Sequence, residues 1–218
     1  MTDTAIITGG AGGMGFATAK LLGRDHRIVL ADLGQERIDR AVAELSALGI
    51  DATGAVADIT DLASVQRLFN DAERDGHHVR AVVHTAGISP QMGTAEKIAR
   101  INGIGTVNIA RTFLPRTQEG DVLVNVASVA GHGLPRPLVP VAAFRLAETR
   151  PAAFEQAVAR RSSLAGKNLR SGLAYAISKA FRGGVNRPGM SGELFAGVRP
   201  LFRVAGGERS RVVRLRLG

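Results

Sequence analysis

The first half of the chain alternates short β-branched runs with longer segments of helical periodicity, and this alternation strongly constrains the fold. The short runs are almost continuously apolar, as expected for strands buried on both faces of a sheet. Strand, helix and strand in succession, joined by right-handed crossovers, predict an α/β fold with a doubly wound parallel sheet. The predicted strands are Thr4–Thr8, Arg27–Asp32, Ala52–Ala57, Val79–His84 and Asp121–Ala127, and the predicted helices are Gly15–Leu22, Gln35–Leu48, Leu62–Asp75 and Ala95–Phe113.

The composition excludes several classes of protein. The chain has 218 residues, of which 45% are hydrophobic and 22% charged, which predicts one soluble domain over residues 1–218. No apolar run approaches the roughly 20 residues that cross a bilayer, and the N-terminus lacks the features of a secretory signal. We therefore expect a cytoplasmic protein without a membrane partner. The absence of cysteine excludes disulfides, zinc–thiolate sites and cysteine nucleophiles.

The net charge of +9 raises the question of nucleic-acid binding. Residues 180–218 carry eight arginines against two glutamates, so most of the excess charge lies in this tail and the remaining residues are nearly balanced. The chain has no tryptophan and one tyrosine, which argues against a platform for stacking bases. The charge pattern therefore does not favour nucleic acid as a partner.

A glycine-rich turn, from Thr8 to Gly15, lies between the first predicted strand and the first predicted helix. Glycines allow a pyrophosphate to approach the backbone, and the helix N-terminus offers free N–H groups to the anion. Asp32 closes the second predicted strand. A carboxylate at that place accepts hydrogen bonds from the adenosine ribose and repels a 2′-phosphate, so the pair of features predicts NAD rather than NADP.

These motifs resemble those of the short-chain dehydrogenase/reductase family, and the likeness spans roughly residues 4–180. It implies a Rossmann fold that binds NAD. Asp58-Ile59 resembles the family's adenine-contacting pair, and Ala86-Gly87 matches the end of its Asn-Asn-Ala-Gly turn, where His84 and Thr85 depart from the pattern. We interpret His84 as structural. The cofactor-binding residues that the resemblance implies are Gly9, Gly13, Met14, Gly15, Asp32, Asp58, Ile59, Ala86 and Gly87, with Tyr175 and Lys179.

The resemblance also implies a catalytic tetrad of Asn102, Ser128, Tyr175 and Lys179, and no metal. Tyr175 and Lys179 are four residues apart and share one face of a helix. A nearby cation favours the phenolate, which brings a tyrosine closer to the pH at which an acid/base catalyst works. Ser128 would hold the substrate oxygen, and Asn102 would position a water in a proton relay. An ordinary exposed Tyr–Lys pair is the alternative interpretation of the motif alone.

Residues 131–172 form an insertion between Ser128 and Tyr175, longer than the family usually shows. A similar enlargement occurs in the hydroxysteroid-dehydrogenase branch, including 3α-type enzymes, and Gly172-Leu173-Ala174-Tyr175 looks like theirs. We expect a lid or an interface arm, whereas a solvent-exposed insertion unrelated to specificity is the alternative. Apolar residues suited to covering a bulky substrate are Leu134, Leu138, Val139, Val141, Phe144, Leu146 and Phe154.

The tail, residues 181–218, is atypical. The family continues its helix beyond the lysine, but here Gly183-Gly184 follows almost at once, and Ser210–Leu217 is the best remaining candidate for a strand. We expect much of 181–209 to be irregular. Three alternatives account for the arginine-rich composition of the tail: a truncation, an out-of-frame reading of the gene, or a native basic tail.

The sequence therefore predicts an NAD-dependent oxidoreductase that interconverts a secondary alcohol and a ketone. The alternative is a catalytically silent NAD-binding protein that lacks a complete substrate site. The family usually forms homodimers or homotetramers through the helices that bear Asn102 and Tyr175, and the second of these helices is the one that the tail disturbs.

Overall fold

Five parallel strands pair in the order β3-β2-β1-β4-β5 at the centre of the fold. The computed structural model describes residues 3–184. Thr8 lies opposite Ala31 on one side and His84 on the other, so the carboxyl ends of three strands meet at one edge. The doubly wound parallel sheet is thereby confirmed. The strands are β1 (Thr4–Thr8), β2 (Arg27–Asp32), β3 (Ala52–Val56), β4 (Val79–His84) and β5 (Val122–Asn125).

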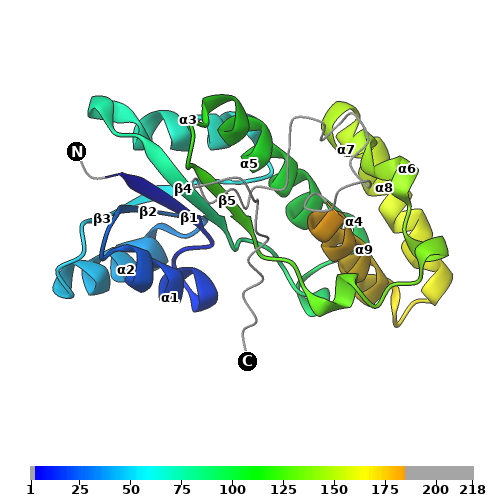
Figure 1. The fold of residues 1–218 in the computed structure, drawn as a ribbon. Coiled ribbons are helices and arrows are strands. Elements are labelled where there is room, and N and C mark those ends of the chain that lie inside the picture. The colour runs from blue at the N-terminus through cyan, green and yellow to red at the C-terminus, as the bar shows by residue number, and fades with distance from the viewer. Residues whose placement is uncertain (1–2, 185–218) are drawn as a thin grey trace.

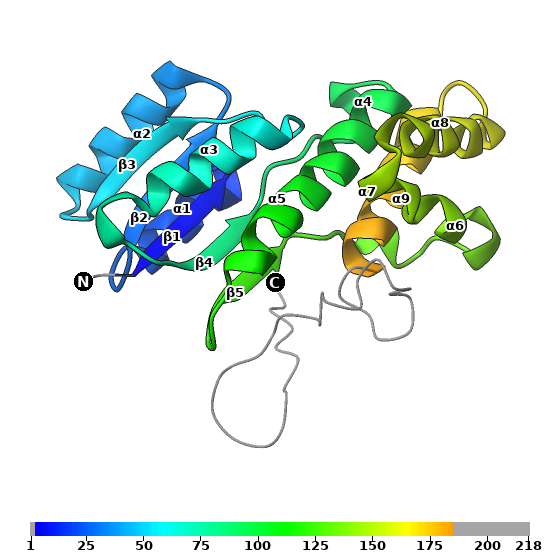
Figure 2. The same cartoon turned by 90° about the horizontal axis from the view of Figure 1, so that it is seen from above.

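Helices cover both faces of this sheet (Figure 1). One face carries α1 (Gly13–Leu22) and α2 (Gln35–Ala47), and the other carries α3 (Leu62–Ala72) and α5 (Gly105–Phe113), as Figure 2 also shows. A π-helical turn, Arg100–Ile104, joins α4 (Ala95–Ala99) to α5, so the predicted helix over 95–113 is continuous but widened in its middle.

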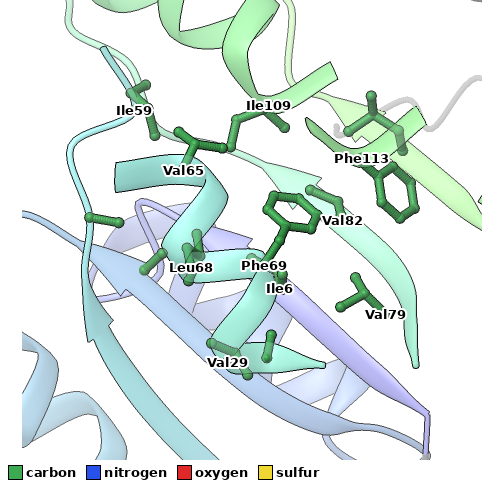
Figure 3. Close-up of a cluster of buried hydrophobic side chains, with 14 of the residues drawn as sticks. Ile6, Val29, Ile59, Val65, Leu68, Phe69, Val79, Val82, Ile109 and Phe113 are labelled. Carbon is green, nitrogen blue, oxygen red and sulfur yellow. The ribbon is translucent and has the colours of Figure 1, made fainter. Parts of the chain in front are cut away.

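The largest hydrophobic core lies between the sheet and the α3–α5 layer (Figure 3). The rings of Phe69 and Phe113 pack there with their centroids 5.9 Å apart, and both side chains are fully buried. Ile6 and Val82 come from β1 and β4 beneath them. Burial on both faces explains why these strands read as continuous apolar runs.

The strand β3 differs from this pattern. Its five residues are intermediate or exposed, although burial on both faces was expected for every strand. It lies at the edge of the sheet, paired only with β2, and the structure packs α2 over one of its faces. Gly54 sits beneath Ile38, at a distance that leaves no room for a side chain.

The insertion forms α6 (Val141–Phe144), α7 (Leu146–Thr149) and α8 (Pro151–Ser162). Phe144 and Phe154 pack with Phe181 of α9 (Arg170–Gly184), with ring centroids 5.0 to 6.4 Å apart. This second core also includes residues of α4, so α8 lies across α4 and α9. Phe144 and Phe154 are therefore core residues and do not form a surface toward a substrate.

The helix α9 continues through Gly183-Gly184, so the first four residues of the tail are helical rather than irregular. The expectations for residues 185–218, including a strand over Ser210–Leu217, fall outside the described residues. Within residues 3–184, no helix is long and apolar enough to cross a membrane.

The packing of Phe154 predicts that the insertion is an integral part of the fold. Phe154→Ala removes a fully buried ring, and we expect it to lower the free energy of unfolding by about 3–5 kcal/mol in chemical denaturation. Leu164→Ala is the control, because Leu164 is 68% exposed and its loss should change the stability by less than about 0.5 kcal/mol. Equal, small effects of the two substitutions would show that α8 does not contribute to the core.

Candidate active site

The glycine-rich turn places the N-terminus of α1 at the carboxyl edge of the sheet. Gly12 is the N-cap residue of α1. Because glycine has no side chain, Gly12 offers no side-chain acceptor to the first N–H groups of the helix. Gly15 lies so close to the turn that a Cβ atom would stand 2.3 Å from the carbonyl oxygen of Gly9. Glycine is therefore required there for helix and turn to pack together. Such a helix end favours an anion such as a pyrophosphate.

Asp32 ends β2 beside this turn, with a side chain that is 10% exposed. Its carboxylate accepts hydrogen bonds from the backbone N–H groups of Ala11 and Leu33, at 3.3 and 2.8 Å. Arg37 of α2 also reaches it, with Nη2 3.2 Å from Oδ2. This ion pair was not predicted from the sequence, although Arg37 follows Asp32 by five residues and so lies in the first turn of the next helix.

A cleft of about 960 Å³ opens along this edge. Asp58 lies in its wall, where its Oδ1 accepts hydrogen bonds from the N–H and the hydroxyl of Thr60. The predicted cofactor-binding residues that line the cleft are Gly9, Gly13, Met14, Asp32, Asp58, Ile59, Ala86 and Gly87. Arg37, Lys97 and Arg100 add positive charge to the same walls. The structure thus brings most of the predicted cofactor residues into one cavity, whereas Gly15, Tyr175 and Lys179 are not part of its lining.

His84, at the end of β4, is fully buried. Its Nδ1 lies 2.6 Å from the hydroxyl of Thr8 and its Nε2 lies 3.2 Å from the hydroxyl of Thr106. Burial lowers the pKa of His84 well below its ordinary value, and the charges of Arg182 and Lys179 lower it further. These contacts agree with a structural role, because a neutral ring with both nitrogens occupied has no atom left for a substrate.

Asn102 lies in the π-helical turn and is fully buried. Its side chain accepts a hydrogen bond from the N–H of Ile88 at 2.9 Å and donates to the carbonyl oxygen of Ile88 at 3.0 Å. It also donates to the hydroxyl of Ser178, at 3.2 Å. Asn102 therefore links the segment that follows Gly87 to α9.

Ser128 begins a 3-10 turn, Val129–Gly131, that packs against α9. A Cβ atom on Gly131 would stand 2.5 Å from the backbone of Lys179 and Ala180, so only glycine allows this approach. The hydroxyl of Ser128 accepts a hydrogen bond from the N–H of Ala130 at 3.3 Å, which leaves its own proton for another acceptor. The predicted serine is thus held beside the helix that carries Tyr175.

Tyr175 and Lys179 share one face of α9, as predicted. The ammonium nitrogen of Lys179 lies 5.4 Å from the centroid of the Tyr175 ring and donates to the carbonyl oxygen of Val126 at 3.2 Å. Lys179 is only 7% exposed. Burial, followed by the charge of Arg182, lowers the pKa of Lys179 to about 8. Among the described residues, no group of three or more His, Asp or Glu side chains could hold a metal ion.

Comparisons with known proteins agree with this geometry. A model of the short chain dehydrogenase family matches residues 3–141. The C alpha-dehydrogenase of a Sphingobium species is 37% identical over 142 residues, which cover 59% of this chain and 46% of that protein. The 1-deoxy-11-beta-hydroxypentalenate dehydrogenase of Streptomyces avermitilis is 35% identical over 124 residues, which cover 52% and 46% of the two chains.

A solved structure of an actinorhodin polyketide ketoreductase with NADPH shares the fold, with a TM-score of 0.55 at 20% identity over 77% of this chain and 65% of that one. The chain spans about half the length of the curated relatives it matches. The family model, in contrast, covers well over half of this chain and includes the glycine-rich turn, Asp32 and Ser128. The chain belongs to the short-chain dehydrogenase/reductase family.

Proposed function

We propose that this protein is an oxidoreductase that transfers a hydride between NAD and a secondary alcohol or ketone. The observation that carries the proposal is the placement of Tyr175 and Lys179 on one face of α9, with the Lys179 ammonium 5.4 Å from the phenol ring centroid. The 3-10 turn that begins at Ser128 packs against the same helix. A proton donor, a cation and a hydroxyl are the groups that alcohol–ketone interconversion requires of the protein.

The lining of the cleft supports a dinucleotide as its ligand. Its walls combine the uncapped N-terminus of α1, which suits a pyrophosphate, with the Asp32 carboxylate, which suits a ribose diol. When bound, the nicotinamide supplies hydride transfer, which no amino-acid side chain can perform. The NADPH of the ketoreductase structure belongs to a protein that is only 20% identical, and Asp32 supports NAD for this chain.

Tyr175 would pass the proton to and from the substrate oxygen. Lys179 would stabilise the phenolate through its charge, and Ser128 would donate its hydroxyl proton to the same substrate oxygen. Asn102 would fix the segment after Gly87 to α9 through its bonds to Ile88 and Ser178. Its place in a proton relay through a water, which the family resemblance implies, is part of the proposal.

The insertion, residues 131–172, would form one side of the substrate site. With Phe144 and Phe154 in the core, Leu134 and Val139 are among the apolar side chains that are only partly buried. A panel of secondary alcohols that includes a hydroxysteroid tests the class of substrate. We further propose that the protein is cytoplasmic. We also propose that it forms a homodimer or homotetramer, and sedimentation can test this oligomeric state.

A catalytically silent NAD-binding protein is the second candidate, because the chain spans only about half of its curated relatives. Binding isotherms for NAD⁺ together with turnover of the alcohol panel separate the two. Tight binding without turnover of any member would favour the silent protein. Turnover that follows the chain through purification would exclude it.

We predict that Tyr175→Phe abolishes most of the turnover and leaves the dissociation constant of NAD⁺ nearly unchanged. The substitution removes one hydroxyl from a half-buried ring, and general acid/base groups contribute about 10²–10⁴-fold to a rate. Steady-state kinetics and calorimetric titration measure the two quantities. Turnover within about threefold of wild type would assign the proton transfer to another group.

We predict that the protein binds NAD⁺ more tightly than NADP⁺, and that Arg37→Ala widens the difference. The Arg37 guanidinium partly neutralises Asp32, and its loss exposes a 2′-phosphate to the full carboxylate charge. We expect the ratio of the two dissociation constants to grow by about three- to tenfold. Arg40→Ala is the control from the same helix. Equal constants for the two cofactors in the wild type would refute the role of Asp32.

The depressed pKa of Lys179, about 8 in the folded protein, predicts a pH-dependent stability. The unfolded state, with a lysine pKa of about 10.4, binds more protons between pH 8 and 10, so the stability of the wild type rises with pH in this window. Lys179→Met removes this contribution. We therefore expect it to raise the free energy of unfolding by about 1–3 kcal/mol at pH 7, and the gain to shrink toward pH 10.

Lys167→Met is the control for this measurement, because Lys167 is exposed. We expect that variant to follow the wild type at every pH. If Lys179→Met instead raises the free energy of unfolding by the same amount at pH 7 and pH 10, burial does not lower the pKa of Lys179.

A further inference from the structure

Arg182 is a fully buried arginine one turn after Lys179 in α9. Its guanidinium donates three hydrogen bonds, which join α9 to the carboxyl edge of the sheet. Nη2 donates to the carbonyl oxygen of Ala86 at 2.8 Å, and Nη1 donates to that of Val126 at 3.1 Å. Nε donates to the hydroxyl of Thr106 in α5, at 2.9 Å. Arg182 thus contacts the ends of β4 and β5 and the neighbouring helix at once.

All three acceptors of this guanidinium are neutral. Within residues 3–184, the structure pairs Arg182 with no carboxylate. A buried charge without a counter-ion is costly, and an apolar side chain of similar size usually stabilises a core better. Burial lowers the pKa of Arg182 to about 10, while the neighbouring Tyr175 raises it in part. The guanidinium therefore stays charged at neutral pH despite its surroundings.

The position of this charge relates it to the proposed proton donor. Lys179 Nζ and Arg182 Nη1 lie 3.2 and 3.1 Å from the same oxygen of Val126, so the two nitrogens are within about 6.3 Å of each other. Lys179 in turn lies against the Tyr175 ring. Two cations are therefore stacked along the face of α9 that carries the phenol.

The other charged or titratable groups around this face do not cancel the two cations. His84 of β4 is neutral, since burial and these cations lower its pKa. Glu96 of α4 is paired with Arg170, at the opposite end of α9. His132, after the 3-10 turn, has its Nδ1 3.4 Å from the carbonyl oxygen of Ser128. Among the described residues, Lys179 and Arg182 are thus the unpaired cations on the face of α9 that carries Tyr175.

We propose that Arg182 is a positioning residue of this site, which clamps the Tyr175–Lys179 face of α9 to the ends of β4 and β5 and supplies a second positive charge on that face, beside Lys179. The proposal rests on the proposed function of Tyr175 as the group that exchanges the proton. It assigns two separable effects to one side chain, the geometry of the guanidinium fork and the charge itself.

The chain offers a direct probe of the charge. Tyr175 is its only tyrosine and it has no tryptophan, so near-ultraviolet absorbance during a pH titration follows the ionisation of this one phenol. The titration uses the full chain without cofactor or substrate. It therefore reports on Arg182 even if no substrate is turned over, and failure of the proposed function is distinguished from failure of this inference.

Arg182→Gln keeps a donor for the carbonyl oxygens but removes the charge. We expect the midpoint of phenol ionisation to rise, because the loss of a nearby positive charge disfavours the phenolate. Arg182→Lys keeps the charge and should stay within a few tenths of a unit of the wild type. Arg170→Gln, which removes an arginine from the same helix at its Glu96 pair, is the matched control and should not move the midpoint.

Circular dichroism checks that each variant is folded. If Arg182→Gln does not fold, Arg182→Met removes the same charge and takes its place. A folded neutral variant whose phenol ionises at the wild-type midpoint would overturn the charge effect. In turnover, the neutral variants should lose about tenfold in kcat at neutral pH and recover toward high pH, whereas Arg182→Lys should keep the wild-type pH profile. A loss that is equal at every pH would leave Arg182 only the role of the clamp and would also overturn the charge effect.

Discussion

Parallel pairing of β2, β1, β4 and β5 forces the carboxyl ends of these strands to one edge, and the candidate site is built on that edge. The last carbonyl groups of parallel strands extend beyond the ladder and need donors from elsewhere. The backbone N–H groups of the following loops supply most of them, since Thr85 donates to Thr8 and Val126 donates to His84. The helix α9 supplies the donors one step further out, because Lys179 and Arg182 donate to Val126 and Arg182 also donates to Ala86. The hydrogen bonds that satisfy Val126 and Ala86 therefore also hold the helix that carries Tyr175 against this edge.

The strands β1, β2 and β4 have the boundaries that the sequence predicts, because each has a buried apolar centre and ends in a polar residue. The glycine-rich turn and the shared face of Tyr175 and Lys179 follow from local spacing, which a sequence displays directly. The strand β3 shows the limit of this reasoning. Its apolar character is weaker than that of the central strands, and only the strand order reveals that it lies at an edge.

Two arginines and the aromatic residues of the insertion escaped prediction for a different reason. Arg37 reaches Asp32 across the start of α2, and Arg182 enters the interior, where arginine is rarely found. Phe144 and Phe154 are visibly apolar, but nothing in their spacing tells which surface they cover. Each of these outcomes depends on side-chain direction and on partners distant in the chain, whereas local periodicity records only the character of each residue.

The buried polar groups beneath the cleft fix one protonation state. Thr106 donates its hydroxyl proton to the carbonyl oxygen of Asn102 at 2.8 Å, so it must accept from Nε2 of His84. Nδ1 of His84 is then unprotonated and accepts from the hydroxyl of Thr8 at 2.6 Å. A proton added to His84 would remove that acceptor and place a third positive charge beside Lys179 and Arg182, which agrees with the strongly lowered pKa of the histidine. Neutral His84 thus connects the glycine-rich turn to α5 without adding a charge, so it does not increase the repulsion between Lys179 and Arg182.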